Sequence, residues 1–323
     1  MTDTLAARPG PQSASRKATS PAALDLAAWW RVARRTVATM QRENMALIAA
    51  GCAFFGLLAM APALGAISAL YGLFNDPADI ARHLQALREI APPPAYEIVQ
   101  QQATTLTATG RRALGIGSLA ALLFAVWTAR LGVRALMTGV VIAYREPSRR
   151  GFLKETAITY LLTLALVMLG AVTIGAIVGV PALLALIPVG GALDIAASAL
   201  RWPLGLMAVM MALGLIYRHA PDRRSAKTQW LTPGAVIAIL LWLAGSVALS
   251  TYLARFADYN ETYGALGAVV ALMVWLWLTA LATLIGAVLN AECELETAGD
   301  TTIGPPRPMG ERGAIVADHV AAG

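Results

Sequence analysis

The stretch that decides the fold runs from Trp230 to Glu296 and reads WLTPGAVIAILLWLAGSVALSTYLARFADYNETYGALGAVVALMVWLWLTALATLIGAVLNAECELE. Residues 228–254 and 264–290 are two runs of 27 uncharged residues, joined by a short polar link. A helix rises about 1.5 Å per residue, so about 20 residues cross the hydrocarbon core of a bilayer. The stretch therefore predicts a hairpin of two membrane-spanning helices.

The composition of the whole chain agrees with a membrane protein. Of its 323 residues 58% are hydrophobic and 14% are charged, whereas a soluble domain has about 25% charged residues. The formal net charge of +6 does not require nucleic acid, because Lys and Arg gather at the cytoplasmic face and on anionic lipid surfaces. Cys52 and Cys293 are the two cysteines, which excludes a disulfide framework and a zinc pattern.

Four further apolar stretches precede the hairpin, so we expect an all-α membrane protein with six transmembrane helices. The predicted spans are residues 45–75, 113–143, 156–193, 194–217, 228–254 and 264–290. Pro62 is expected to kink the first span, and Pro181 to stop or unwind the third. Residues 25–296 form the predicted membrane domain, between disordered tails at 1–24 and 297–323.

Two segments outside the spans also have helical patterns. Residues 22–44 carry Trp29 and Trp30 among several arginines, which favours a helix on the membrane surface over an ordinary basic anchor. The segment Asp76–Arg112 is polar, with three prolines between two helical patterns. It predicts a short helical hairpin outside the membrane, either a cap over a cavity or a solvated loop.

The distribution of basic residues predicts the orientation in the membrane. With six spans, seventeen Lys and Arg residues lie on the side of the N-terminal segment and five on the other. The positive-inside rule then places both termini in the cytoplasm of a multi-pass protein of the inner membrane. The segment Asp76–Arg112 faces outward in this arrangement.

Arginines inside the second predicted span are the sharpest candidates for function. Arg130 and Arg134 are four residues apart and share a helix face, and charges within a span indicate function by default. Trp127 precedes them on the same span. The alternative is that both arginines extend to lipid phosphates at the cytoplasmic surface.

Two weaker candidates lie on the outer side. Asp194 and Arg201 are seven residues apart and form either an ion pair or, separately, a helix cap and a headgroup contact; we favour the latter. Tyr259, Glu261 and Tyr263 lie in the hairpin link. They close the outer mouth of a cavity or, as we prefer, form a turn with aromatic residues at the interface.

Residues 25–296 contain an ordered set of motifs that resembles the YihY/BrkB family of bacterial inner-membrane proteins. The residues that carry the resemblance are Pro62, Trp127 to Arg130, Tyr144 to Arg150, Trp230, Pro233 to Ala235, Trp242, Phe256, Tyr259, Tyr263, Gly264, Leu266, Gly267, Trp275 and Gly286 to Asn290. One departure is Val288, where family members usually carry an acidic residue; the nearest acid here is Glu292. The resemblance implies six spans in the inner membrane. Members of the family have been labelled ribonuclease BN, linked to virulence and suspected of transport.

The chain lacks the residues that a ribonuclease needs. His83, His219 and His319 are the only histidines, and the predicted topology puts them on two sides of the membrane and in a tail. We therefore expect no catalytic residues, no metal and no cofactor. The remaining hypothesis is transport or handling of a lipid or another anionic amphiphile, with membrane lipids as partners and no nucleic acid. The alternative is a scaffold that docks an envelope protein through the Asp76–Arg112 segment.

Overall fold

The computed structural model describes residue 18 and residues 20–74, 111–147, 149–184, 192–255 and 265–320. The regular elements in these ranges are all helices, as expected. The elements are η2 (Pro21–Ala23), α1 (Leu26–Arg42), α2 (Met45–Phe74), α5 (Arg111–Ala143), α6 (Phe152–Leu184), α7 (Ala192–His219), α8 (Thr228–Arg255), α10 (Ala265–Glu294) and α11 (Ile315–Asp318). Most of the Asp76–Arg112 segment lies outside the described residues, and so do Tyr259, Glu261 and Tyr263.

Four helices of the described part are long and apolar enough to cross a membrane. Their spanning segments are Leu119–Ala143, Phe152–Thr173, Thr228–Leu253 and Val269–Glu294. The pair α1 and α2, bent by 64°, makes a fifth if it is one span, and α7 contributes a shorter apolar part, Pro203–His219. The structure therefore supports a membrane protein of several spans, while the count of six stays a prediction.

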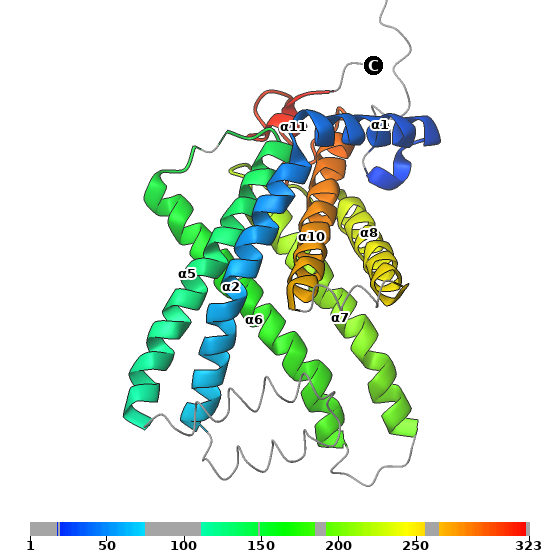
Figure 1. The fold of residues 1–323 in the computed structure, drawn as a ribbon. Helices are drawn as coiled ribbons and strands as arrows, with labels where there is room; N and C mark the ends of the chain where they lie inside the picture. Colours follow the sequence, from blue (N-terminus) through cyan, green and yellow to red (C-terminus); the bar gives the residue numbers. More distant parts are fainter. Residues whose placement is uncertain are drawn as a thin grey trace, which may run out of the picture.

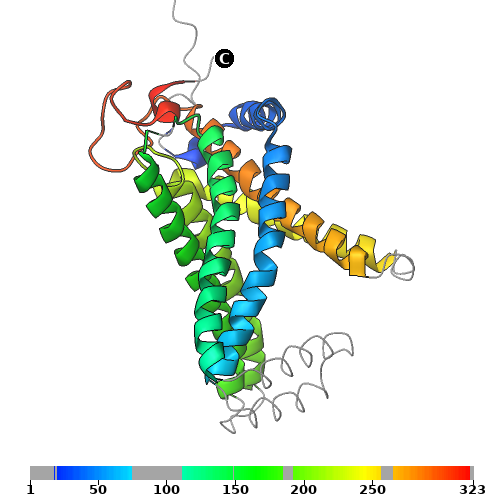
Figure 2. The ribbon, with the colours of Figure 1, turned by 60° about the vertical axis from the view of Figure 1, so that its left-hand side comes forward.

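The long helices pack in pairs. Helix α2 lies along α5, α6 packs against α7, and α8 pairs with α10 (Figure 1). The α8–α10 hairpin leans away from the other long helices, and Figure 2 shows this most clearly. Helix α10 holds the groups together, because it also contacts α1, α2 and α5. Helix α1, α11 and the C-terminal segment lie at one end of the bundle, which we call the α1 end.

Helix α1 directs Arg31 and Arg35 toward the glutamates at the end of α10 and leaves Arg34 and Arg42 exposed. Asp25 caps it by accepting a hydrogen bond from the backbone N of Ala28 at 2.7 Å. One face buries Ala28 and Val32, while Trp30 on another face is 71% exposed. Asn44, with a φ of 51°, makes the corner between α1 and α2.

Two glycines allow α8 and α10 to cross closely. A Cβ at Gly234 would collide with the carbonyl oxygen of Gly286, and a Cβ at Gly286 with the Tyr217 hydroxyl and the carbonyl of Gly234. Buried Asn290 closes the crossing, because it accepts from the backbone N of Gly234 at 2.7 Å and donates to the carbonyl of Leu231 at 3.0 Å. The Pro-Gly-Ala and Gly-to-Asn motifs in the hairpin thus have a packing role.

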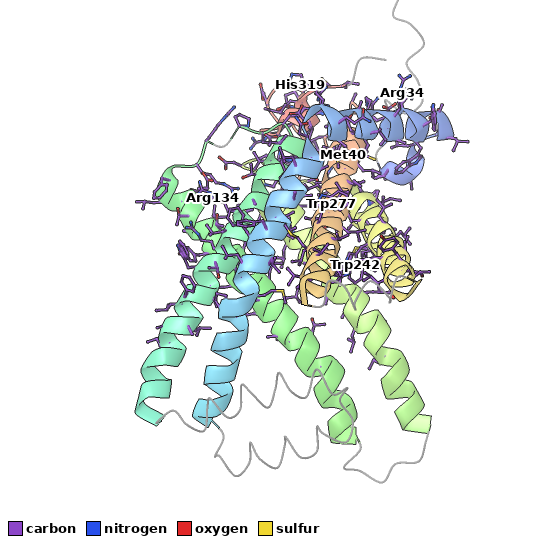
Figure 3. The ribbon with its side chains drawn as sticks, in the orientation of Figure 1. Arg34, Met40, Arg134, Trp242, Trp277 and His319 are labelled. Carbon is purple, nitrogen blue, oxygen red and sulfur yellow. The ribbon has the colours of Figure 1, made fainter. Side chains whose placement is uncertain are left out.

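Tryptophans connect the hairpin to its neighbours. Trp242 on α8 donates to Thr279 on α10 at 3.0 Å, and Trp277 on α10 donates to the carbonyl of Ala46 on α2 at 3.1 Å. Both lie along α10 in Figure 3. The indole N–H groups therefore pair with protein acceptors inside the bundle.

The segment after α10 makes defined contacts with the rest of the chain. In residues 297–320, within the predicted tail, Thr302 forms a β-bridge with Ala226, and buried Arg312 donates to the carbonyls of Ala298 and Ala317 at 2.8 and 2.6 Å. Composition does not reveal the contact of Thr302 with Ala226, because the two residues are far apart in the chain.

Two of the prolines singled out in the sequence lie inside described helices. Helix α6 is described to Leu184, three residues past Pro181, and Pro62 lies inside α2, so the stop near Pro181 and the kink at Pro62 stay predictions. Helices tolerate proline within a membrane because neighbouring groups satisfy the freed carbonyl. Helix α7 begins at Ala192, two residues before Asp194, so Asp194 does not precede the helix as a cap would.

Candidate functional site

Arg130 lies deep within α5 without a carboxylate partner in the described part of the chain. It precedes the helix end at Ala143 by thirteen residues, which is about 20 Å along the axis. Its guanidinium lies over the ring of Tyr160 on α6, 4.8 Å from the centroid, and its Nε is buried without a hydrogen-bond acceptor. A half-buried cation held by an aromatic ring keeps its charge available for an anionic ligand.

Arg134 lies one turn nearer to the α1 end, where α5 and α6 cross (Figure 3). Its side chain is 51% exposed, and its Nη2 is 4.0 Å from Oε1 of Glu155, a distance at which an exposed pair contributes little. It borders a pocket of about 110 Å³ that Arg150 and Thr159 also line. The structure thus places Arg130 and Arg134 along the contact of α5 with α6.

The other predicted residues are not brought to this place. Trp127 is exposed and stacks on Phe124, with ring centroids 5.6 Å apart. Asp194 and Arg201 lie in α7, and their side chains lie outside the described part. An ion pair between them, and the outer-mouth role of residues 259–263, stay predictions.

A cluster of arginines and glutamates at the α1 end is the feature that sequence reasoning missed. The carboxylate of Glu292, at the end of α10, is 1% exposed. It accepts from Arg35 at 2.9 Å, from Arg145 at 2.6 Å and from the Thr39 hydroxyl at 3.1 Å. Glu296 accepts from Arg31 at 2.6 Å and from Arg35 at 2.7 Å. These five charged residues, the Arg/Glu network, join α1, α10 and the turn after α5.

A second buried pair lies beside the network. Arg223 donates to Glu294 at 2.7 Å, with side chains 2% and 0% exposed, and Thr301 donates to the same oxygen at 2.7 Å. Burial lowers the pKa of Arg223, but the charge and hydrogen bond of Glu294, together with Tyr144 and Glu146, outweigh burial and raise it. Arg223 also covers the ring of Tyr144 at 4.9 Å. Its charge is therefore fixed, and the pair fastens the C-terminal segment to α10.

The network was detectable from one signal in the sequence. Glu292, Glu294 and Glu296 follow the last apolar run, where carboxylates next to a helix C-terminus are unfavourable unless cations surround them. The arginines that do so are up to 265 positions away in the chain. No local pattern could pair them.

An apolar groove separates α7 from α8 on the hairpin side. Its volume is about 730 Å³, within the range of small-molecule sites. The lining is aliphatic over most of its length, and four polar residues, Arg218, His219, Thr228 and Thr232, stand at the α1 end. It is much larger than the pocket at Arg134, and it lies on different helices.

The described residues offer no hydrolytic constellation. Within them no group of three or more His, Cys, Asp or Glu side chains is placed to hold a metal ion. The ring Nδ1 atoms of His219 and His319 lie 3.0 and 2.9 Å from carbonyls of their own helical turns. Nothing in this arrangement points to a ribonuclease.

Comparison with known proteins gives one family and several relatives. The family described as "Virulence factor BrkB" matches residues 36–309. The ribonuclease-like protein YfkH of Bacillus subtilis is 28% identical over 224 residues, which cover 64% of this chain and 76% of the relative. A UPF0761 membrane protein of Idiomarina loihiensis is 32% identical over 155 residues, 47% of this chain and 52% of the relative.

A third relative matches a shorter part, and solved structures add nothing. A UPF0761 membrane protein of Xanthomonas campestris is 35% identical over 89 residues, which cover 27% of this chain and 21% of the relative. The matched region is thus about half of the second relative and about a fifth of the third. No solved structure gives a significant match.

Proposed function

The chain belongs to the BrkB virulence-factor family of membrane proteins, and on this premise we propose that it binds and moves an anionic amphiphile such as a lipid. The observation that carries the proposal is Arg130. An arginine far inside a span is costly, and no carboxylate pairs with it among the described residues. A passing anionic headgroup would supply the missing partner, with Arg134 as the next contact toward the α1 end.

The small pocket at Arg134 suits a lipid better than a dissolved solute. A solute needs an enclosed polar path, whereas about 110 Å³ is described at Arg134. A lipid needs polar contacts only for its headgroup, because its acyl chains stay in the bilayer. Exposed apolar side chains flank the arginines on α5, Leu123 and Phe124 among them. Acyl chains would contact this surface while the headgroup meets the arginines.

The topology proposed for this function has six spans in the inner membrane, with both termini in the cytoplasm. Helix α1 and the C-terminal segment lie at the same end of the bundle, which favours an even number of spans. Exposed Leu26 and Trp30 on α1 suit burial at the headgroup level. Arg34 beside them points away from the bundle in Figure 3, where lipid phosphates would lie.

A flux assay in vesicles tests the proposal. The protein is reconstituted with a trace of fluorescent phosphatidylglycerol or phosphatidylcholine, and a membrane-impermeant quencher reports how much label reaches the outer leaflet. We expect wild type to move phosphatidylglycerol faster than protein-free vesicles do, and Arg130→Gln to slow this movement. Arg42→Gln is the control, because Arg42 is exposed and bonds only to neighbouring Glu43 among the described residues.

The outcomes separate transport from its alternative. Equal movement in wild-type and protein-free vesicles would sink the transport proposal. The second candidate is then a scaffold for an envelope complex, which the rigid α1 end favours, since the Arg/Glu network and residues 297–320 make an ordered surface there. The activity of a scaffold would not depend on Arg130.

A further inference from the structure

The groove between α7 and α8 is not filled by any described side chain. Its walls carry methionines at positions 207, 210 and 211 and aliphatic residues of α8. Methionine side chains adapt to ligands of irregular shape. A groove of about 730 Å³ between two membrane helices is therefore open to an acyl chain.

Gly214 shows that the groove is a space and not a close helix contact. A Cβ built at Gly214 has no atom within 4 Å, whereas one built at Gly234, Gly245 or Gly286 collides with a neighbouring helix. Glycine at those three positions lets helices approach. At position 214 glycine instead leaves space in the groove that a side chain would fill.

The groove ends at an exposed arginine, Arg218. Arg218 is exposed, and no ion pair holds it in the described part of the chain, unlike Arg150, which bonds to Asp222 at 3.1 Å. The Thr228 and Thr232 hydroxyls lie at the same end. An apolar groove that ends in an exposed guanidinium and hydroxyls matches a lipid that has an acyl chain and a phosphate.

We propose that this groove binds one phospholipid with an anionic headgroup, its acyl chain along α7 and α8 and its phosphate at Arg218. This site is on different helices from Arg130, and it stands whether or not the protein moves lipids. A second copy of the chain is the competing occupant. It is less suited, because an apolar helix laid in the groove would cover Arg218 without supplying an anion.

Two matched pairs of variants test the site. Gly214→Phe fills the groove, and Gly170→Phe is its control, because Gly170 on α6 is exposed and a Cβ there also meets nothing within 4 Å. Arg218→Gln removes the headgroup contact, and Lys154→Gln removes an exposed cation of the same end that lies outside the groove. Melting curves in detergent check that all four variants fold.

The measurement is retention of defined lipids by native mass spectrometry after delipidation and addition of phosphatidylglycerol or phosphatidylcholine. We expect wild type, Gly170→Phe and Lys154→Gln to retain one phosphatidylglycerol, and Gly214→Phe to lose it. Arg218→Gln should lower the preference for phosphatidylglycerol about fivefold, since one basic side chain at an anionic surface contributes about 1 kcal/mol.

Three results would overturn the proposal. Equal retention by Gly214→Phe and Gly170→Phe would show that the lipid lies elsewhere. An unchanged preference of Arg218→Gln for phosphatidylglycerol would show that Arg218 does not contact the phosphate. A dimer that dissociates in Gly214→Phe would identify the groove as a subunit interface. A photoreactive acyl chain gives a check on the wild-type protein itself: its crosslinks should fall on residues 206–215 and 231–240, and crosslinks confined to other helices would also refute the site.

Discussion

Arg35 of α1 bonds to Glu292 of α10, with Nε 2.9 Å from Oε2 of a carboxylate that is buried. Glu292→Gln should weaken this contact and the one to Arg145, and destabilise the protein by about 1.5–3 kcal/mol, the usual contribution of a hydrogen bond to a charged group. A thermal unfolding curve in detergent reports the loss as a lower melting temperature.

The matched control for this prediction is Glu43→Gln. Glu43 pairs with Arg42 at 2.8 Å, but the side chain of Arg42 is 62% exposed. An exposed pair contributes about 0–1 kcal/mol, so Glu43→Gln should hardly change the melting temperature. Equal losses in both variants would show that the Arg/Glu network does not fasten α1.

Gly286→Ala should destabilise the α8–α10 crossing, and Gly214→Ala should not. The new methyl at position 286 meets the Tyr217 hydroxyl and the carbonyl of Gly234, whereas the one at position 214 meets nothing. Overpacking costs about 1–3 kcal/mol, while Ala in place of Gly in a helix contributes about 1 kcal/mol in the other direction. Melting temperatures should thus fall for Gly286→Ala and stay or rise for Gly214→Ala; the reverse order would refute the crossing.

The stability of the α1 end should depend on pH through Glu146. Burial raises the pKa of this carboxyl above its ordinary value of 4.5, although the backbone N of Ile315 donates to it at 2.6 Å. A raised folded-state pKa means that the contribution to stability is full at pH values below 4.5 and is lost as the pH rises through the folded-state pKa. Glu146→Gln, which still accepts the hydrogen bond, escapes this loss.

The difference in melting temperature between Glu146→Gln and wild type should therefore shift in favour of the variant from pH 4.5 to pH 8. Glu311→Gln, at an exposed position, corrects for general effects of pH on the detergent complex. A difference that is constant over this range would show that Glu146 does not couple the end of the chain to pH.

The sequence predicts the long helices because their pattern is local. Apolar runs without charge set their limits, so that α2 begins at Met45, α5 ends at Ala143 and α8 begins at Thr228, as expected. The contact between Gly234 and Gly286 could not be predicted from the sequence, since both glycines are equally consistent with small residues that face lipid. The family resemblance includes both of these motifs, and the comparisons confirm the family.

The candidate site could be predicted only in part, for a physical reason. Arg130 can be recognised from the sequence because it is a charge within an apolar run. Its partner Tyr160 cannot, because only the fold brings the Tyr160 ring centroid to 4.8 Å from the Arg130 guanidinium. The Arg/Glu network and the groove at Gly214 depend on contacts, or on a lack of contacts, between distant helices. Which residues come together in them follows from the packing, and no local pattern predicts the pairing.

Arg312 should determine whether residues 297–320 stay folded on the bundle. Its buried guanidinium donates to the carbonyls of Ala298, Gly299 and Ala317 at 2.8, 3.0 and 2.6 Å. Arg312→Gln leaves the buried carbonyl of Ala317 without this donor, at a cost of about 1–3 kcal/mol, and also removes the bonds to the part-buried carbonyls of Ala298 and Gly299. Limited proteolysis should then cleave this segment in the variant faster than in wild type.

Arg312→Lys should not rescue the segment, because an ammonium cannot reach acceptors spread around a planar guanidinium. Exposed Arg307 is the control: its Nη1 lies 3.4 Å from the carbonyl of Glu311, so Arg307→Gln should leave the cleavage rate unchanged. Rapid cleavage of the wild-type segment, or full protection in Arg312→Lys, would mean that charge or other contacts hold it. Protection that depends on the guanidinium alone assigns the fold of this end to Arg312.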